Sequence, residues 1–375
     1  MTSTKTIHIA LGSNKGNKLD NLQEAINTIY KSIGVVKSIS RVYKTPAMGF
    51  EGDDFYNACI SIQSDLEPKP LLKALLNVEK ELGRTRSKSD QYESRTIDLD
   101  ILLYEDTVVD TKTLKIPHPE FHNRRFVLQP LNDIAKSMEH PVLKQSVSGL
   151  LDICEDESPI EPLNIWLKNP RKSYQFKNYN YIAIEGNIGA GKTSLAHKIS
   201  DDFNAKLILE RFADNPFLPK FYEDPDRYAF TLEMSFLADR YQQISDDLSQ
   251  LDLFKDFIVS DYDVYKSLIF SKITLPEDEF LLYRKLFYQV YKDIAKPDLY
   301  VYLYQNTERL QENIKRRGRD YEQGIKDEYL EKINAGYLDF LRSNNELNVK
   351  IIDISDRDFV KSREDYLWIL DQICY

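Results

Sequence analysis

The first half of the chain alternates short apolar strand patterns with two helical patterns. A strand pattern at 6–11 (TIHIAL) comes first, and helices are predicted at 18–32 and 68–82. The later strand patterns are 35–45, 56–63 and 96–104. The resulting order, βαββαβ, predicts a ferredoxin-like antiparallel sheet with its helices on one face.

In the second half, strand patterns alternate regularly with helical stretches. The strand patterns are 181–185, 206–210, 257–261, 298–304 and 349–354. Such alternation predicts a parallel, doubly wound sheet. The expected fold is therefore an α/β chain of two domains: a ferredoxin-like α+β domain, then a five-stranded parallel sheet flanked by helices.

The boundary between these domains is expected near residues 155–180. This stretch holds three prolines, begins with acidic residues and ends with basic and aromatic ones. We therefore predict a first domain at 1–160, a linker at 161–178 and a second domain at 179–375. The length of 375 residues suits two domains of ordinary size.

Composition narrows the class of protein. Hydrophobic residues make up 42% of the chain and charged residues 29%, which predicts a soluble globular protein. The formal net charge of −10 argues against a nucleic-acid polymer as partner, whereas small nucleotides need only local donors. Three widely spaced cysteines and the lack of a long apolar run predict a cytoplasmic protein without a membrane partner.

A phosphate-binding loop opens the second half. The sequence GNIGAGKT fits GxxxxGK[ST] between a predicted strand and a predicted helix at 194–203, where its backbone N–H groups turn toward phosphate oxygens. The candidate ATP-binding residues are Gly186, Asn187, Ile188, Gly189, Ala190, Gly191, Lys192 and Thr193. Lys192 is expected to reach the β- and γ-phosphates and Thr193 to bind Mg²⁺. The loop alone leaves ATPase, GTPase and kinase open.

Carboxylates follow the next two predicted strands. Glu210 ends one of them and is a candidate base, while Asp261 ends the other and is a candidate Mg²⁺ ligand. A basic cluster, KRRGR at 315–319, ends a later helix. Either it clamps a transferring phosphoryl group or it is a solvated helix face.

Taken together, GNIGAGKTS, the strand-ending Glu210, FYEDPDRYAFTLEMSFLADRYQ and RRGRDYEQGIKDEYLEKI resemble the deoxyribonucleoside kinases, over about 179–375. The resemblance implies that Glu210 accepts the proton of the nucleoside 5′-hydroxyl. It also implies that Tyr222 and Glu322 bind the 3′-hydroxyl, that Arg240 contacts the base, and that Arg317 and Arg319 are lid arginines. A homodimer through this domain is expected on the same ground.

Three positions depart from the pattern of that family. Glu233 stands where a base-reading glutamine is usual, and Asn313 where a lid arginine is frequent. The motif after the third strand reads Asp261-Tyr262-Asp263, so the arginine that supports the 5′-hydroxyl is missing. An ionised Glu233 only accepts hydrogen bonds, which suits guanine, or adenine with a water or a protonated carboxyl as second contact. Bacterial relatives with purine preference place deoxyadenosine first and deoxyguanosine second.

In the first half, RTIDLDIL alternates polar and apolar residues, so Asp98 and Asp100 share one strand face. Such a pair either holds Mg²⁺ with ATP phosphates or is a solvated strand face. Cations cluster near it in the sequence: Arg84, Arg86, Arg95, Arg124 and Arg125.

Five motifs, ALGSNKGN, YKTPAMG, FYNACI, GRTRSKSDQYESRTIDLDILLY and IPHPEFHNRRFVLQPL, resemble 6-hydroxymethyl-7,8-dihydropterin pyrophosphokinase over about 5–160. The resemblance implies two Mg²⁺ on Asp98 and Asp100. The implied ATP residues are Glu79, Arg84, Arg95 and His118, with Arg86 in the catalytic loop. Pterin is implied to stack between Phe55 and Phe126 and to be read by Asn57 and the Thr45 backbone. Tyr92 and Ser94 stand where relatives often carry Trp and Pro.

The sequence therefore predicts a bifunctional ATP- and Mg²⁺-dependent transferase, with one Mg²⁺ in the second domain. One half makes a pterin pyrophosphate for folate biosynthesis, and the other phosphorylates a purine deoxynucleoside in salvage. The alternative is that the second half is a degenerate nucleotide-binding or dimerisation module.

Overall fold

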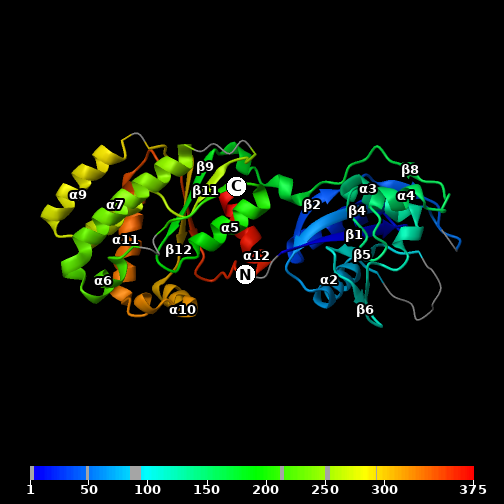
Figure 1. Cartoon of the computed structure of the whole chain (residues 1–375), viewed down its shortest axis with the longest axis horizontal. Helices are drawn as coiled ribbons and strands as arrows, with labels where there is room; N and C mark the ends of the chain where they lie inside the picture. Colours follow the sequence, from blue (N-terminus) through cyan, green and yellow to red (C-terminus); the bar gives the residue numbers. More distant parts are fainter. Residues whose placement is uncertain (1–3, 48–49, 85–93, 212–214, 250–253, 293) are drawn as a thin grey trace. The chain divides into compact units, whose positions relative to one another are not determined.

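A computed structural model describes residues 4–47, 50–84, 94–211, 215–249, 254–292 and 294–375. The chain forms two compact units, Met1–Ser173 and Tyr174–Tyr375 (Figure 1). The expected linker at 161–178 is divided between them: its first part pairs with strand β3 of the first unit, where Lys44 lies opposite Glu161. Within the described ranges, no helix combines the length and apolar character needed to cross a membrane.

An antiparallel sheet forms the centre of the first unit. Its strands follow the order β5-β1-β4-β3-β8, and β2 is also paired with β4. Its strands are β1 (Lys5–Ser13), β2 (Val35–Ile39), β3 (Tyr43–Thr45), β4 (Phe55–Ser64), β5 (Asp98–Tyr104) and β8 (Glu161–Pro162). A separate two-stranded ribbon joins β6 (Val109–Asp110) and β7 (Lys115–Ile116).

The single strand predicted at 35–45 is wrong, because the chain is interrupted between β2 and β3. The hydroxyl oxygen of Ser40 accepts a hydrogen bond from the Cys59 N–H at 2.8 Å. A side chain thus replaces a backbone acceptor at this point, and the regular ladder ends there.

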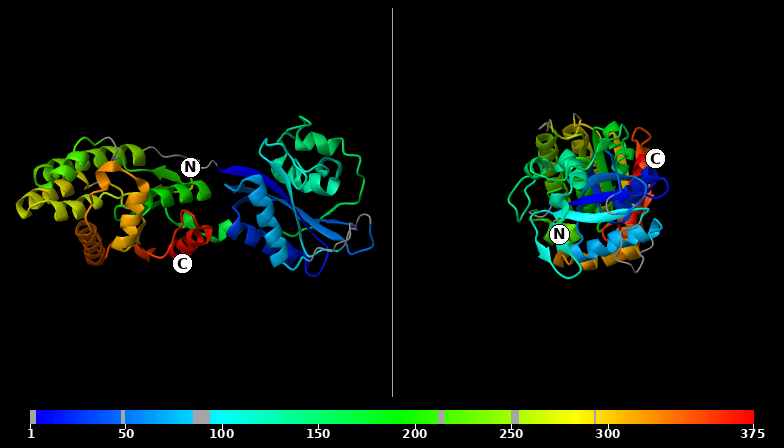
Figure 2. Two further views of the ribbon diagram at one scale, coloured as in Figure 1. Left: turned by 90° about the horizontal axis from the view of Figure 1, so that it is seen from below. Right: turned by 90° about the vertical axis from the view of Figure 1, so that its right-hand side faces the viewer.

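Helices cover both faces of this sheet (Figure 2). The predicted helices α1 (Lys18–Ser32) and α2 (Pro68–Glu81) pack on one face. The expectation of helices on one face only is wrong, because α3 (Arg125–Ala135) and α4 (Val147–Asp152) cover the other. There the small side chains of Ala10 and Cys59 alternate outward from β1 and β4 and leave room for Leu128 and Leu131. A short 3₁₀ turn, Phe121–Asn123, precedes α3.

The second unit has the predicted parallel sheet, in the order β10-β11-β9-β12-β13. Its strands are β9 (Tyr181–Gly186), β10 (Lys206–Ile208), β11 (Ile258–Ser260), β12 (Leu299–Tyr304) and β13 (Val349–Asp353). Tyr181, Ala183, Tyr300 and Tyr302 project from one face and pack against helices. Since β9 lies in the middle of the order, the loop after it opens at the switch point where ligands bind in such sheets.

Helices flank both faces of the parallel sheet, as expected (Figure 1). The helix α5 after the phosphate loop contacts β9, β10 and β11, whereas α8 and α11 cover the tyrosine-rich face. The helices are α5 (Lys192–Phe203), α6 (Leu218–Glu223), α7 (Pro225–Ser249), α8 (Lys266–Thr274), α9 (Glu277–Val290), α10 (Thr307–Arg317), α11 (Asp327–Ser343) and α12 (Arg363–Cys374). Short 3₁₀ turns are Pro170–Ser173, in the first unit, and Phe176–Asn178 and Asp320–Glu322 in the second.

Candidate active sites

A cavity of about 1110 Å³ lies on the face of the first sheet that α3 and α4 cover in part. Its floor follows from strand register: Gly12 of β1 lies between Asn57 of β4 and Asp98 of β5. A Cβ on Gly12 would come within 3.2 Å of the Asn57 Oδ1. The glycine therefore leaves the floor open for a flat ligand, a role that the sequence analysis did not assign to it.

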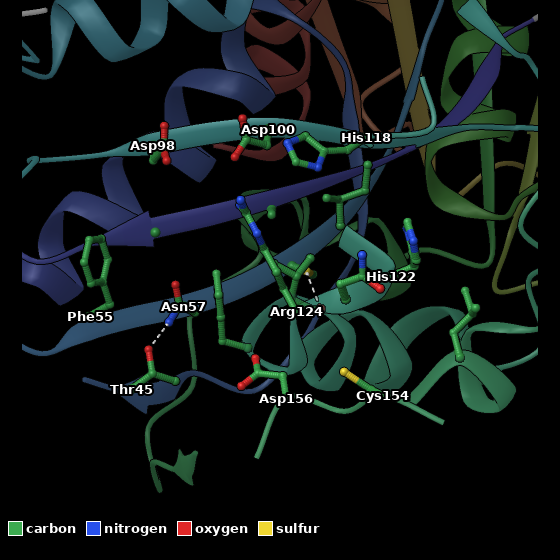
Figure 3. Close-up of a pocket in the computed structure, with 18 of the residues that line it drawn as sticks. Thr45, Phe55, Asn57, Asp98, Asp100, His118, His122, Arg124, Cys154 and Asp156 are labelled. Atoms are coloured by element: carbon green, nitrogen blue, oxygen red, sulfur yellow. Dashed lines mark hydrogen bonds between the residues drawn. The ribbon is translucent and has the colours of Figure 1, made fainter. Parts of the chain in front are cut away.

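Asp98 and Asp100 lie along one edge of this cavity (Figure 3). Arg84 and Arg95 form ion pairs with Asp98, and Arg84 also pairs with Glu79. Burial and the neighbouring carboxylates Asp98 and Glu79 raise the pKa of Asp100 to about 7. Two carboxylates held this close favour a cation between them.

The donor set of this edge fits Mg²⁺ bound together with a phosphate. No group of three or more acidic, His or Cys side chains forms a metal cluster in the described parts of the chain. Mg²⁺ keeps several waters and commonly takes only one or two carboxylates plus substrate phosphates. Asp98 and Asp100 meet that requirement, with phosphate oxygens completing the shell.

The opposite part of the cavity is aromatic and amide-lined. Asn57 donates to the Thr45 hydroxyl at 2.8 Å, and both side chains are buried. Phe55 and Phe126 line the same cavity, and the Arg95 guanidinium lies 6.0 Å from the Phe55 ring centre. A fixed amide beside two rings suits a flat heterocycle with polar edges.

His118 is also brought to the cavity, near Asp100 in Figure 3. Burial and the nearby positive charge of Arg124 lower the pKa of His118, so the ring is neutral at pH 7. Its Nδ1 accepts from the Glu120 N–H at 3.2 Å, which leaves the proton on Nε2 as a donor for a phosphate oxygen. The predicted catalytic residue Arg86 and the nearby Tyr92 lie outside the described residues.

Two further residues hold this site together, and no role was predicted for either of them from the sequence. Buried Asn14 accepts from the Arg95 N–H at 2.8 Å and so fixes the backbone from which Arg95 extends. Asp156 lines the cavity and accepts from the Arg125 N–H at 2.9 Å, capping α3 from outside the helix.

In the second unit, the phosphate loop follows β9 and continues into α5. Gly189 and Gly191 both have φ of +85°, a backbone conformation that favours glycine. Lys192 Nζ donates to the carbonyl oxygens of Gly186 and Asn187 at 2.9 and 3.0 Å. The Asn187 side chain donates to the Leu330 carbonyl, which ties the loop to α11.

The two candidate Mg²⁺ ligands of this unit are in contact. Thr193 Oγ1 donates to Asp261 Oδ2, and the Glu210 N–H donates to Asp261 Oδ1 at 2.8 Å. A hydroxyl and a carboxylate at the start of α5, beside the phosphate loop, form the donor set that a Mg²⁺–nucleotide takes. Thr193 and Asp261 therefore fit one Mg²⁺.

Glu210 lies just past β10, and cations hold both of its oxygens. Arg240 donates to Oε1 from Nε and Nη2 at 2.9 and 2.6 Å, and Lys266 Nζ donates to Oε2 at 2.5 Å. Burial opposes ionisation here, but the charges and hydrogen bonds of Lys266 and Arg240 outweigh it and lower the pKa of Glu210 to about 2. No sequence pattern predicted that Lys266 belongs to the site.

Glu233 lines the same cavity and is 3% exposed. Its Oε1 accepts from the Thr274 hydroxyl at 3.2 Å, whereas Oε2 has no hydrogen-bond partner among the described residues. Burial raises the pKa of Glu233 to about 7, against the opposing effect of Arg240. A buried carboxyl with a free oxygen facing a cavity is arranged to recognise a ligand.

The remaining predicted residues form a wall of the cavity from the end of α10, the turn after it and α6. Arg317 and Arg319 both pair with Glu322, which is 5% exposed. Tyr222 lies beside this group with its ring 6.0 Å from that of Tyr321, and burial and Glu322 raise the pKa of its hydroxyl. All four predicted residues line one cavity of about 120 Å³.

That volume is smaller than the roughly 300–1,000 Å³ of ordinary ligand pockets, so a ligand has to displace part of the wall. At the end of α10, Glu322 pairs with Arg317, the last residue of that helix, and with Arg319, two residues past it. Asn313, earlier on α10, instead donates to the Gly189 carbonyl at 3.0 Å and holds the phosphate loop.

Comparisons with known proteins divide the chain in the same way. The deoxynucleoside kinase family model matches residues 182–374, and the model of 7,8-dihydro-6-hydroxymethylpterin-pyrophosphokinase (HPPK) matches residues 8–136. Deoxyguanosine kinase of Bacillus subtilis is 35% identical over 50% of this chain and 92% of its own length.

The pyrophosphokinase of Aquifex aeolicus, named for 2-amino-4-hydroxy-6-hydroxymethyldihydropteridine, is 38% identical over 44% of this chain and 98% of its own length. A solved structure of deoxyadenosine kinase from M. mycoides is 26% identical, with a TM-score of 0.44 over 52% of this chain and 99% of that one. The chain thus belongs to two transferase families, the HPPK family through its N-terminal half and the deoxynucleoside kinase family through its C-terminal half.

Proposed function

We propose that the N-terminal half transfers a pyrophosphoryl group from ATP to 6-hydroxymethyl-7,8-dihydropterin. The observation that carries this proposal is the cavity that joins an acidic edge at Asp98 and Asp100 to an aromatic and amide-lined part at Phe55 and Asn57. The pterin hydroxymethyl oxygen attacks the β-phosphorus of ATP, the bond between the α- and β-phosphates breaks, and AMP leaves. Two Mg²⁺ at the acidic edge supply charge neutralisation for the phosphates.

The residues of this chain then have separate tasks. Asn57, fixed by Thr45, reads the pterin edge, and Phe55 and Phe126 stack on its faces. Arg84, Arg95 and His118 bind phosphate oxygens, since Arg84 and Arg95 exchange their contacts with Asp98 for contacts with ATP. Arg95 is held in place by Asn14.

The nature of the nucleotide product tests this proposal. The full chain, incubated with ATP, Mg²⁺ and the pterin alcohol, is expected to release AMP in amounts equal to pterin pyrophosphate, as separated by anion-exchange chromatography. Release of ADP instead of AMP, or AMP formation that does not depend on the pterin, contradicts it.

For the C-terminal half, we propose 5′-phosphorylation of a purine deoxynucleoside by ATP, with one Mg²⁺ at Thr193 and Asp261. Glu210 accepts the hydrogen bond of the 5′-hydroxyl and takes its proton. With a pKa of about 2, Glu210 is a weak base, so it acts mainly by orienting the hydroxyl. This is sufficient in a loose phosphoryl-transfer transition state, in which the proton leaves late.

Glu233 is the residue that supports a purine. When ionised, its free oxygen and the oxygen shared with Thr274 accept from N1–H and N2–H₂ of guanine. When protonated, it donates to N1 of adenine and accepts from the 6-amino group. The sequence favours deoxyadenosine, but the similarity to a deoxyguanosine kinase over 92% of that protein places deoxyguanosine first in our proposal.

A panel of the four deoxynucleosides with ATP tests the assignment. Deoxyguanosine is expected to give the highest kcat/KM at pH 8, deoxyadenosine the next, and both pyrimidines much lower values. A preference for deoxycytidine or thymidine contradicts the role of Glu233.

The alternative, a nucleotide-binding module without turnover, draws on the missing arginine and on the small cavity of this half. Nucleoside phosphorylation by the full chain that is lost in Glu210→Gln supports the enzyme. Nucleotide binding without any turnover supports the module.

A further inference from the structure

A lysine occupies the place in the site that the missing arginine leaves without a charge. At the expected position stands Tyr262, which is 0% exposed and packs in an apolar cluster. Tyr262 carries no charge, and burial raises the pKa of its hydroxyl further. The positive charge that the missing arginine would bring to Glu210, beside that of Arg240, therefore has to come from another residue.

Lys266 begins α8, and its ammonium group reaches Glu210 across 56 positions of sequence. Nζ lies 2.5 Å from Glu210 Oε2, and the side chain is 11% exposed. A lysine is rarely buried to this degree without a specific partner, because desolvation of the ammonium group is costly. The centre of the Phe270 ring lies 5.5 Å from Nζ, within the range of a cation–π contact.

Arg240 and Lys266 bind different oxygens of the Glu210 carboxylate. Arg240 binds only Oε1 and is itself fixed through Nη1 by the Ser267 hydroxyl at 2.6 Å. Lys266 binds only Oε2. A carboxylate oxygen has two acceptor sites, and Arg240 fills both sites of Oε1, so Oε2 keeps one site for the substrate hydroxyl. Because cations hold both oxygens, the carboxylate cannot rotate.

Lys266 also lies toward the phosphate loop. It lines the same cavity as Lys192, Thr193 and Asp261. The cation on Oε2 therefore faces the cavity that the phosphate loop also lines.

We propose that Lys266 is a positioning residue that takes over the task of the missing arginine: it holds Oε2 of Glu210 so that this carboxylate meets the acceptor hydroxyl beside the phosphate loop. The inference rests on the proposed nucleoside kinase activity. It gives the C-terminal half a complete set of charges around Glu210, which a degenerate module does not need.

Steady-state kinetics of the full chain test this assignment. Lys266→Met keeps the length of the side chain and removes the charge, and it is expected to lower kcat about 100-fold or more while the nucleoside KM changes less than about threefold. Lys266→Arg restores the charge and is expected to recover kcat to within about tenfold of wild type. The matched control is Lys296→Met, because Lys296 forms an exposed ion pair with Glu346 and should leave kcat unchanged.

A double-mutant cycle separates positioning from a structural role. If Lys266 acts through Glu210, then adding Lys266→Met to Glu210→Gln lowers kcat by less than about threefold. Lys266→Met leaves Oε2 of the buried Glu210 carboxylate without its cation; the double variant has no carboxylate there, so it is expected to fold even if Lys266→Met does not. Losses that multiply in the double variant, or a Lys266→Met protein with wild-type kcat, overturn the inference. A wild-type chain without nucleoside phosphorylation refutes the proposed function itself and not the role of Lys266 within it.

Discussion

Replacement of Glu233 by Gln removes a buried carboxyl group. The protonation state of this group is expected to affect both the free energy of unfolding and the recognition of the nucleoside base. The ordinary pKa of 4.5 rises to about 7 in the folded chain, mainly because of burial. The folded state therefore binds the proton more tightly than the unfolded state, and its contribution to stability is complete below pH 4.5 and is lost as the pH rises through 7. A shift of this size corresponds to about 3 kcal/mol.

Glu233→Gln is expected to differ from wild type by less than about 1 kcal/mol in the free energy of unfolding at pH 5 and to be more stable by about 3 kcal/mol at pH 8. The chain has two tryptophans, Trp166 and Trp368, and the second lies in α12 of the C-terminal unit. Urea unfolding followed by fluorescence in a Trp166→Phe background reports on that unit alone. If the free energy of unfolding depends on pH in the same way with Glu233 and with Gln at this position, the pKa of Glu233 is not raised.

The same group predicts opposite pH profiles for two substrates. Between pH 6 and pH 8 its ionised fraction rises from about one tenth to about nine tenths. The kcat/KM for deoxyguanosine should then rise about ninefold and that for deoxyadenosine fall to a similar extent. Titration of ATP and Mg²⁺ cancels in the ratio of the two substrates. This ratio is expected to lose its pH dependence in Glu233→Gln. If the ratio varies with pH in the variant as it does in wild type, Glu233 does not recognise the base through its protonation state.

Three further substitutions test local parts of the account. Gly191→Ala places a Cβ within 2.8 Å of an aromatic ring at a φ of +85°. The KM for ATP in nucleoside phosphorylation should therefore rise about tenfold or more. The control is Gly324→Ala, which should leave this KM unchanged because no atom lies within 4 Å of its Cβ. Gly12→Val fills the floor of the first cavity, and pterin binding by calorimetry should be lost with nucleoside phosphorylation intact; retained pterin affinity contradicts the position of that site. Asp156→Ala removes the cap at the Arg125 N–H, so the first unit should lose about 1 kcal/mol of stability in urea unfolding, and an unchanged midpoint contradicts this contact.

Secondary structure was most predictable where apolar and polar residues alternate regularly and no side chain takes a backbone hydrogen bond. The helix expected at 18–32 is α1, Lys18–Ser32, and the strand expected at 56–63 lies within β4, Phe55–Ser64. The strand expected at 206–210 is shorter, because β10 ends at Ile208. Past this point the Glu210 N–H binds the Asp261 carboxylate and leaves the ladder. The strand therefore ends two residues before Glu210, which belongs to the site.

Site residues were predictable when they belong to a local motif or to one strand face, as with Asp98 and Asp100. Lys266 was not, because its contact with Glu210 joins side chains 56 positions apart and does not depend on local spacing. Asp156 likewise reaches Arg125 across 31 positions. Helices on the second face of the first sheet were missed for a related reason: small residues such as Ala10 and Cys59 give no strong apolar signal for the face that they open.

We propose that one chain carries two separate kinase sites. The test is to measure pterin-dependent AMP release and deoxynucleoside-dependent ADP release on the same preparations of wild type, Asp98→Ala and Glu210→Gln. We predict that Asp98→Ala abolishes the first activity and leaves the second within about twofold, and that Glu210→Gln does the reverse. Loss of both activities in either variant, or of neither, contradicts the claim.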